Sequence, residues 1–249
     1  MLDYLISRFN SFTLGSDITA ENLRPQIKRN FKYIPASKII IICLPGWGGK
    51  LNKWKFLEKY ASGSRASFLA YEFPRGIFSD QKDRTRELFE EVNTFVRDEI
   101  KNLKDKYKFE KCILVCISLA SSYGSLIYKD NPDINEIILV APGEDIAKDM
   151  WHGCRTQHFR KSYEKQGFNE AQLIEAWSGL ASKNNFPTRG AKIKILLGRS
   201  DGVIPYEFSH VLVEIYKQFR LNVVERTFPL GHYFLISYFL LLPGHFLQL

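Results

Sequence analysis

Residues 111–120 read KCILVCISLA, and the stretch that follows continues with small and apolar residues as far as Lys129. The segment from Cys112 to Cys116 is apolar at every position. An unbroken apolar run of this length is typical of a strand that is covered on both faces of its sheet. The residues from about Leu119 onward predict a helix. Ser118 therefore lies in the turn between a buried strand and a helix.

The same alternation of strand and helix patterns extends in both directions from this turn. Short apolar, β-branched runs predict further strands at 38–44, 67–73, 136–141, 192–197 and 222–228, and a weaker pattern predicts an edge strand within 26–34. Apolar residues at helical spacing predict helices at 51–61, 81–106 and 205–219. This order predicts an α/β fold, in which a mainly parallel sheet carries helices on both faces, joined by right-handed crossovers.

One interval is too long for a simple crossover. Residues 142–190 separate two predicted strands by about fifty residues. Within them, Asn169 with Gln172 three positions later predicts the start of a helix over 170–181. We interpret 143–190 as a small helical lid inserted into a core made of 1–142 and 191–249. Its aromatic residues could contact a substrate or form the core of the lid itself: Trp151, Phe159, Tyr163 and Trp177.

Composition restricts the class of protein. The 249 residues are 45% hydrophobic and 14% aromatic, which is too much buryable surface for a disordered chain. The net charge of +8 could indicate binding to nucleic acid, but acidic and basic residues alternate along the predicted helices and no dense basic run occurs. We therefore expect no nucleic-acid partner.

Cysteine usage argues against a metal site. Cys112 and Cys116 lack a second pair at zinc-binding spacing, and Cys43 likewise lies in an apolar run, where a thiol packs as a small hydrophobic group. Unpaired thiols suit a reducing compartment. The chain begins Met1-Leu2-Asp3-Tyr4, without the basic region of a signal peptide. These features favour a cytoplasmic protein.

The last stretch, 233–249, is strongly apolar, but it contains Pro243 and Gly244 and is short for a membrane span. We expect a packed C-terminal helix and no stable membrane span. Attachment at a membrane interface is a lesser alternative. A second copy of the chain could also pair with this apolar segment, giving a homodimer.

Candidate catalytic residues follow three of the predicted strands. Ligands of open parallel sheets bind beyond the carboxyl ends of the strands. Ser118, Asp201 and His232 each come directly after a strand, in that order along the chain. The loop Gly46-Trp47-Gly48, after another strand, can supply backbone amides at the same edge.

With these motifs, the chain from about Ile39 to Phe234 resembles the α/β-hydrolase superfamily. The resemblance implies that Ser118 is the nucleophile, His232 the general base and Asp201 the acid. It also implies an oxyanion hole formed by the backbone N–H groups of Trp47 and Leu119. The phrase Gly198-Arg-Ser-Asp-Gly-Val-Ile-Pro205 is similar to the superfamily's acid loop, and Gly231-His232 to its usual histidine turn.

The chain departs from the superfamily pattern at several positions. Cys116 and Ala120 stand where the turn around the nucleophile usually has glycines, and Pro45-Gly46 stands where His-Gly is common. Both Cys116 and Ala120 are small, so the turn can close with some crowding. These differences concern the subfamily more than the three catalytic candidates.

Each candidate also has a purely structural reading. Ser118 could be a helix N-cap, with Ser121 and Ser122 as weaker alternative nucleophiles. Asp201 could stabilise its own turn, in which case Glu144 or Asp145, after the strand at 136–141, would be the acid. His232 could be a structural histidine, although no other histidine of the chain follows a strand: His152, His158, His210 and His245. Cys116 belongs to a strand and is a poor candidate nucleophile.

The leading functional hypothesis is a serine hydrolase that cleaves a carboxylic ester, thioester or lactone of a small-molecule acyl substrate, without a metal or organic cofactor. A peptidase, amidase or carbon–carbon bond hydrolase of the same fold is an alternative, because fold and catalytic residues do not separate these reactions. A non-catalytic binding protein with this fold is another. The basic residues of the predicted lid either favour an anionic substrate or form a solvated surface: Lys148, Arg155, Arg160, Lys161 and Lys165.

Overall fold

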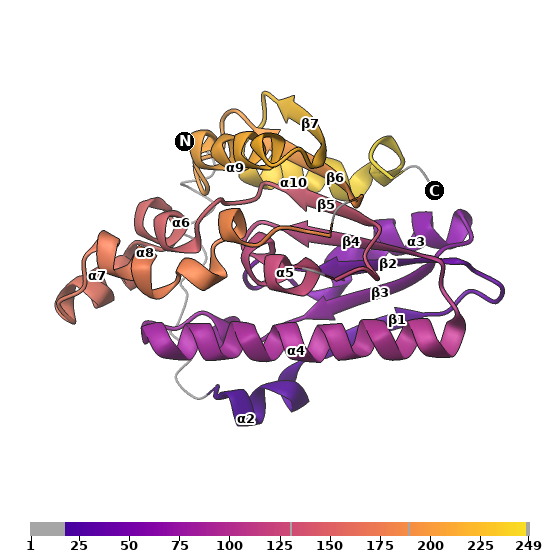
Figure 1. The fold of residues 1–249 in the computed structure, drawn as a ribbon, viewed down its shortest axis with the longest axis horizontal. Helices are drawn as coiled ribbons and strands as arrows, with labels where there is room; N and C mark the ends of the chain where they lie inside the picture. The colour runs from indigo at the N-terminus through magenta and orange to yellow at the C-terminus, as the bar shows by residue number, and fades with distance from the viewer. Residues whose placement is uncertain (1–17, 130, 189, 248–249) are drawn as a thin grey trace.

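The computed structural model describes residues 18–129, 131–188 and 190–247. They form a seven-stranded sheet in the order β1-β3-β2-β4-β5-β6-β7, and β1 is the one antiparallel strand (Figure 1). The strands are β1 (Lys28–Lys32), β2 (Ile39–Leu44), β3 (Ser67–Glu72), β4 (Lys111–Ile117), β5 (Glu136–Val140), β6 (Lys192–Gly198) and β7 (Asn222–Phe228). The predicted strands are confirmed, including the edge strand.

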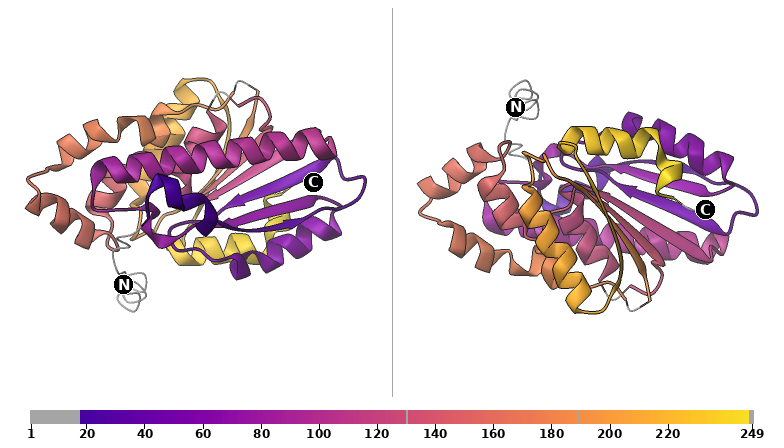
Figure 2. Two further views of the ribbon diagram at one scale, coloured as in Figure 1. Left: turned by 90° about the horizontal axis from the view of Figure 1, so that it is seen from below. Right: turned by 90° about the horizontal axis from the view of Figure 1, so that it is seen from above.

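Helices cover both faces of this sheet. They are α2 (Ala20–Leu23), α3 (Lys55–Gly63), α4 (Lys82–Tyr107), α5 (Ala120–Tyr128), α6 (Ile146–His152), α7 (Gln157–Lys165), α8 (Glu170–Ala176), α9 (Tyr206–Gln218) and α10 (His232–Leu241). Short 3₁₀ turns occur at Arg24–Gln26, Leu51–Trp54, Arg75–Ile77, Ser178–Leu180, Ser182–Asn184 and Pro243–His245. Figure 2 shows α4 on one side of the sheet and α3 with α10 on the other.

The apolar strands explain this two-sided packing. Successive strand side chains point to opposite faces, so an all-apolar strand needs cover on both. In β2, Ile40 and Ile42 belong to the hydrophobic cluster beneath α4, α5 and α9, whereas Ile41 and Cys43 belong to the cluster beneath α3 and α10. The predicted α/β fold, a mainly parallel sheet between two helical layers, is confirmed.

The insertion between β5 and β6 consists of α6, α7, α8 and two 3₁₀ turns. Figure 1 shows its helices extending beyond one end of the sheet. Asn169 and Gln172 exchange reciprocal side-chain to backbone hydrogen bonds of 3.0 Å, as predicted, although α8 ends at Ala176 rather than at Ala181. The large apolar residues of the insertion belong to the hydrophobic cluster beneath α4. The division into core and lid stays a prediction.

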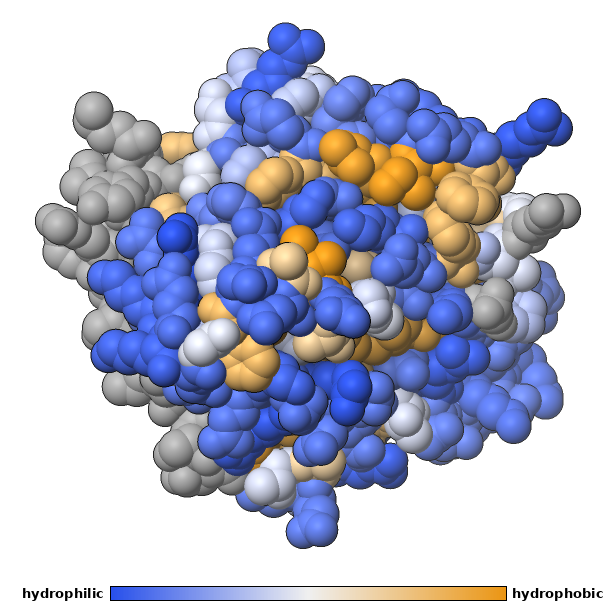
Figure 3. All heavy atoms as spheres, turned by 60° about the vertical axis from the view of Figure 1, so that its left-hand side comes forward, coloured by the Kyte–Doolittle hydropathy of each residue, from blue (hydrophilic) through white to orange (hydrophobic). Residues whose placement is uncertain are grey.

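The C-terminal segment forms α10 and a 3₁₀ turn, as the sequence predicts. No helix in the described part of the chain is both long enough and apolar enough to cross a membrane. α10 exposes Phe234 and Leu241 to solvent, and Leu242, directly after the helix, is exposed as well. Pairing of two chains here stays a prediction. The face drawn in Figure 3 is mainly hydrophilic, with apolar atoms gathered in a few patches. Residues 1–4, on which the expectation of no signal peptide rests, lie outside the described residues.

Candidate active site

Ser118 occupies a strained turn between β4 and α5. Its φ of 56° is in the left-handed region, which costs a non-glycine residue roughly 1–2 kcal/mol. The Ser118 N–H donates to the carbonyl of Val140 on the neighbouring strand at 2.8 Å, and the Ser118 carbonyl accepts from the N–H of Ser121 at 2.9 Å. These bonds hold the turn in place. Backbone strain of this kind concentrates at functional sites, where it aims a side chain outward.

Two other glycines provide the space that glycines at positions 116 and 120 would give to the Ser118 turn. A Cβ atom added to Gly124 would lie 2.5 Å from Cys116 Sγ, so Gly124 provides the space that the larger side chain at 116 requires. On the other side of the turn, a Cβ at Gly46 would lie 3.0 Å from the Ile117 carbonyl and 3.1 Å from Ser118 Cβ. Gly46 therefore lets the loop after β2 approach Ser118 closely. Gly124 lies one helical turn beyond Ala120, outside the positions where the superfamily pattern has its glycines.

Three predicted residues form a continuous chain of hydrogen bonds. His232 Nε2 lies 2.9 Å from Ser118 Oγ, and His232 Nδ1 lies 2.7 Å from Asp201 Oδ2. The other carboxylate oxygen, Asp201 Oδ1, accepts the N–H groups of Val203 and Ile204, each at 2.9 Å. His232 begins α10 and Asp201 follows β6, so the carboxyl ends of different strands bring these groups together.

The arrangement selects one tautomer of the histidine. An ionised carboxylate can only accept hydrogen bonds, so Asp201 favours a proton on His232 Nδ1. Nε2 then carries the lone pair and can accept the Ser118 hydroxyl proton. His232 is 2% exposed and Asp201 9% exposed, which keeps water from competing for their bond.

The alternative acids are engaged elsewhere. Glu144 forms an ion pair with Lys148 at 2.8 Å. Asp145 accepts the Ala147 N–H at the start of α6 at 3.0 Å and pairs with Lys183 at 2.8 Å. Of the three acids considered from the sequence, Asp201 is the one that contacts His232.

The alternative nucleophiles also have structural roles. Ser121 Oγ accepts the N–H of Gly143 at 3.1 Å, and Ser122 is buried within α5. Cys116 is fully buried, and this burial raises the pKa of its thiol, so the reactive thiolate is disfavoured. The remaining histidines, His152, His158, His210 and His245, are not among the residues that line the cavity at Ser118.

Ser118 and His232 open into a cavity of about 500 Å³. Trp47 and Leu119, the predicted oxyanion-hole residues, line the same cavity. Its wall is largely apolar and includes Trp54, Phe78, Ile146, Met150, Tyr233, Ile236 and Leu240. A volume of this size accommodates a small molecule.

The aromatic residues proposed as substrate contacts lie behind this wall. Trp151, Phe159 and Trp177 are buried in the main hydrophobic cluster and are not among the lining residues. Phe159 packs against Trp47 and Phe78, with ring centroids 5.4 Å and 4.6 Å away. These aromatics therefore pack behind the wall, in the hydrophobic cluster that the insertion shares with the sheet and α4. Their role as substrate contacts stays a prediction.

Asp149, on α6, is an acid in the cavity wall that no sequence motif indicates. Its Oδ1 is buried without a hydrogen-bond partner among the described residues. Burial raises the pKa of the Asp149 carboxyl well above its usual value, and the nearby charges of Asp145, Glu144 and Asp201 raise it further, against a smaller opposing effect of Lys148. The fold therefore favours the protonated form of this carboxyl.

This raised pKa predicts a pH-dependent stability. Protonated Asp149 contributes to the free energy of unfolding. This contribution is fully present below the pKa of the group in the unfolded chain, about 3.9, and it is lost as pH rises through the higher pKa of the folded protein. Asp149→Asn carries no such loss. We expect the free energy of unfolding of the variant to exceed that of the wild type at pH 8. Urea titrations at pH 8 and pH 4.5 should show this advantage shrinking at the lower pH; an equal difference at both would contradict the assignment.

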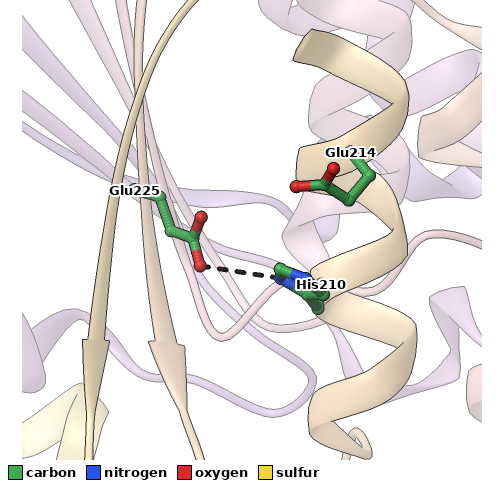
Figure 4. Close-up of side chains that lie close together, drawn as sticks. All are labelled: His210, Glu214 and Glu225. Atoms are coloured by element: carbon green, nitrogen blue, oxygen red, sulfur yellow. Dashed lines mark ion pairs between the residues drawn. The ribbon is translucent and has the colours of Figure 1, made fainter. Parts of the chain in front are cut away.

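One cluster away from the cavity has metal-ligating side chains. His210 and Glu214 lie one turn apart on α9, and Glu225 faces them from β7 (Figure 4). The Lys217 ammonium lies 3.1 Å from both Glu214 and Glu225, and His210 Nδ1 lies 3.6 Å from Glu225. Because Lys217 already pairs with both carboxylates, this cluster is explained as a surface ion-pair network.

Comparisons with known proteins identify the fold. No protein-family model matches the chain, and no curated protein sequence matches it significantly. Among solved structures, it is similar to an esterase from Pyrococcus furiosus, with a TM-score of 0.61 and 15% identity over 90% of this chain and 84% of that one. It is also similar to acetyl xylan esterase 1 from Thermoanaerobacterium sp. JW/SL YS485, with a TM-score of 0.60 and 14% identity over 83% of this chain and 74% of that one. A monoacylglycerol lipase from Paleococcus ferrophilus gives a TM-score of 0.56 and 16% identity over 83% of this chain and 90% of that one.

Identities this low establish the shared architecture alone. Together with the mainly parallel seven-stranded sheet and its helical layers, they show that this chain has the α/β-hydrolase fold.

Proposed function

We propose that the protein is a serine hydrolase that cleaves a carboxylic ester, or a related thioester or lactone, through Ser118, His232 and Asp201. The observation that carries the proposal is the unbroken hydrogen-bond chain from Ser118 Oγ through His232 to Asp201, opening into the cavity. A serine hydroxyl is a poor nucleophile unless an adjacent base removes its proton, and this chain supplies that base.

The proposed reaction uses these three side chains in turn. His232 Nε2 accepts the Ser118 proton as Oγ attacks the ester carbonyl, and the resulting imidazolium is stabilised by the Asp201 carboxylate. His232 then returns the proton to the departing alcohol, which leaves an acyl group on Ser118. Water then attacks the acyl carbonyl while His232 takes one of its protons. The bond between the acyl carbon and Ser118 Oγ breaks, the acid departs, and His232 returns the proton to Oγ.

Backbone amides would stabilise the tetrahedral intermediate. We assign this role to the N–H groups of Leu119, directly after Ser118, and Trp47, on the loop that Gly46 brings to the turn. Each preorganised donor of this kind lowers the barrier by about 3 kcal/mol. The scheme requires no metal or organic cofactor.

The cavity and the structural relatives support an ester substrate. The largely apolar wall suits an acyl or alcohol group with hydrocarbon character. The similar solved structures include an acetyl xylan esterase, other esterases and a monoacylglycerol lipase. A small-molecule ester is therefore the substrate class we favour over a peptide.

Labelling with a fluorophosphonate tests the proposal. We expect the probe to attach to Ser118, located by mass spectrometry of the digested protein, and to fail with His232→Ala, because the hydroxyl then lacks its base. The His232→Ala variant must retain its melting temperature for this comparison. Absence of labelling in folded wild-type protein, with no hydrolysis of short 4-nitrophenyl esters, would instead favour a binding protein with a hydrolase fold.

A further inference from the structure

Asp149 is an acid in the wall of the cavity at Ser118 that the proposed reaction does not use. Among the described residues that line this cavity it is the one carboxylic acid, and it is half-buried on α6. Its Oδ1 atom is enclosed and has no hydrogen-bond partner in the described part of the chain. A buried polar atom without a partner is unfavourable, because the hydrogen bonds that it made to water are not replaced. A ligand that supplies the missing partner is therefore favoured at this point of the wall.

The fold leaves a defined space for the Asp149 carboxyl group. A Cβ at Gly143 would lie 1.4 Å from Asp149 Oδ2 and 2.3 Å from its Cγ, so the carboxyl occupies the place that a side chain at 143 would fill. The Gly143 N–H donates to Ser121 Oγ at 3.1 Å, and the carbonyl of Pro142 accepts from Ser209 Oγ at 2.5 Å, which fixes this backbone. Gly143 is not among the residues with positive φ. The glycine is therefore required for space and not for its backbone conformation.

The helix that carries Asp149 is packed against the loop of the proposed catalytic acid. The Asp149 N–H donates to the carbonyl of Asp145, and the Asp149 carbonyl accepts from the Gly153 N–H, each at 2.9 Å. A Cβ at Gly153 would lie 3.1 Å from the carbonyl of Val203, the residue whose N–H donates to Asp201 Oδ1. The backbone on both sides of Asp149 is thus fixed, and its side chain is held in the wall of the cavity that contains the proposed nucleophile.

The protonation of Asp149 decides what kind of ligand group it can bind. Burial raises the pKa of the Asp149 carboxyl, and the nearby negative charge of Asp145 raises it further, so the fold favours the neutral acid. A neutral carboxylic acid donates one hydrogen bond through its O–H and accepts others through its remaining lone pairs. A hydroxyl group also donates one hydrogen bond and accepts others. The two groups are therefore matched, and neither carries a charge that the apolar wall would have to bury.

From these observations we infer that the substrate is an ester carrying a hydroxyl group, and that Asp149 binds this hydroxyl while the ester carbonyl lies at Ser118. Asp149 is then a residue that determines specificity. This inference rests on the proposed ester hydrolase function and specifies its substrate class. The hydroxyl belongs to the acyl part or to the alcohol part of the substrate, and the experiment has an arm for each.

The test uses two matched pairs of substrates. On the acyl side, the 4-nitrophenyl ester of 3-hydroxyhexanoic acid is compared with that of hexanoic acid. On the alcohol side, 1-hexanoylglycerol is compared with propyl hexanoate. For at least one pair we expect kcat/KM to be higher for the hydroxylated member. We expect Asp149→Leu, which replaces both carboxyl oxygens by methyl groups, to reduce the hydroxylated-to-plain ratio by about 10-fold, the scale of one neutral hydrogen bond.

Three further variants sharpen the comparison. Asp149→Asn should keep most of the ratio, because an amide also donates and accepts hydrogen bonds. Gly143→Ala should lower the ratio as Asp149→Leu does, because the new methyl group takes the place of the carboxyl. Glu164→Leu removes an acid of the same insertion that pairs with Arg160 outside the cavity, and it should leave the ratio and both rates unchanged. Melting temperatures of all variants identify any that fail to fold.

A third pair of substrates distinguishes a hydroxyl from a cation as the group that Asp149 binds. Hexanoylcholine carries a quaternary ammonium group, and 3,3-dimethylbutyl hexanoate is its uncharged counterpart of the same shape. We expect Asp149→Leu to change kcat/KM for these two esters equally. A preference for hexanoylcholine that Asp149→Leu abolishes would show an ionised Asp149 that binds a cation, and it would overturn the inference.

The outcomes separate the inference from the proposed function. Hydrolysis of the plain esters with no preference for a hydroxyl in either of the first two pairs overturns the inference and leaves the proposed function standing. An equal effect of Asp149→Leu on both members of those pairs does the same, because Asp149 would then only position the neighbouring loop. No hydrolysis of any of these esters overturns the proposed function and the inference with it.

Discussion

Replacing Ser118 with alanine is expected to lower kcat for a 4-nitrophenyl ester by about 10⁵- to 10⁶-fold, the scale seen when a serine hydrolase loses its nucleophile. Ser118 Oγ is the atom that would form the acyl-enzyme. Without this hydroxyl, His232 has no nucleophile beside it to activate. Activity that remains would come from the oxyanion hole and substrate binding alone.

The structure makes this variant easy to interpret. The backbone at Ser118 is held by hydrogen bonds of its own N–H and carbonyl groups, which alanine retains. We therefore expect an unchanged circular dichroism spectrum and a similar melting temperature. Ser122→Ala is the matched control, because it removes a hydroxyl from α5, the helix that follows the Ser118 turn, away from the cavity. Its activity should stay within a few fold of the wild type. Retention of more than a tenth of the activity by Ser118→Ala would show that another group is the nucleophile.

Replacing Asp201 with asparagine should lower kcat by about 10⁴-fold near pH 7. The side-chain shape and the acceptor for the Val203 and Ile204 N–H groups can be kept, so the loop should fold. The amide that faces His232 Nδ1 can donate a hydrogen bond, which favours the tautomer with its proton on Nε2. That tautomer cannot accept the Ser118 proton, so the loss arises from the wrong protonation pattern and not from misfolding.

Glu144→Gln and Asp145→Asn are the comparison variants for this prediction. Their carboxylates pair with Lys148 and Lys183, so the changes should lower stability more than kcat. Rates measured under saturating substrate, alongside urea unfolding of each variant, separate the two effects. A silent Asp201→Asn together with a large loss of kcat in Glu144→Gln or Asp145→Asn would reassign the acid.

Local sequence patterns were sufficient for most of the fold. The buried strands β2, β4 and β5 contain unbroken apolar runs. The long helix α4 has its own apolar periodicity, and its Leu88, Phe89, Val92 and Val96 are buried against the sheet. The place of Ser118 after β4 follows from the same patterns. The end of α8 was predicted less accurately, because the apolar residues after Ala176 continue in a 3₁₀ turn with the same buried face.

The sequence by itself determined the elements, their order along the chain and the side chains that follow the strands, because strand and helix periodicity are properties of neighbouring residues. Only the tertiary structure decided which acid meets His232, since Asp201 and the acids at 144 and 145 all follow strands of the same sheet edge. It also decided that Arg155 lines the cavity while Trp151 and Trp177 pack behind it, and that Gly124 makes room for Cys116. These outcomes depend on contacts between residues far apart in the chain, and such contacts are set by the packing of whole elements.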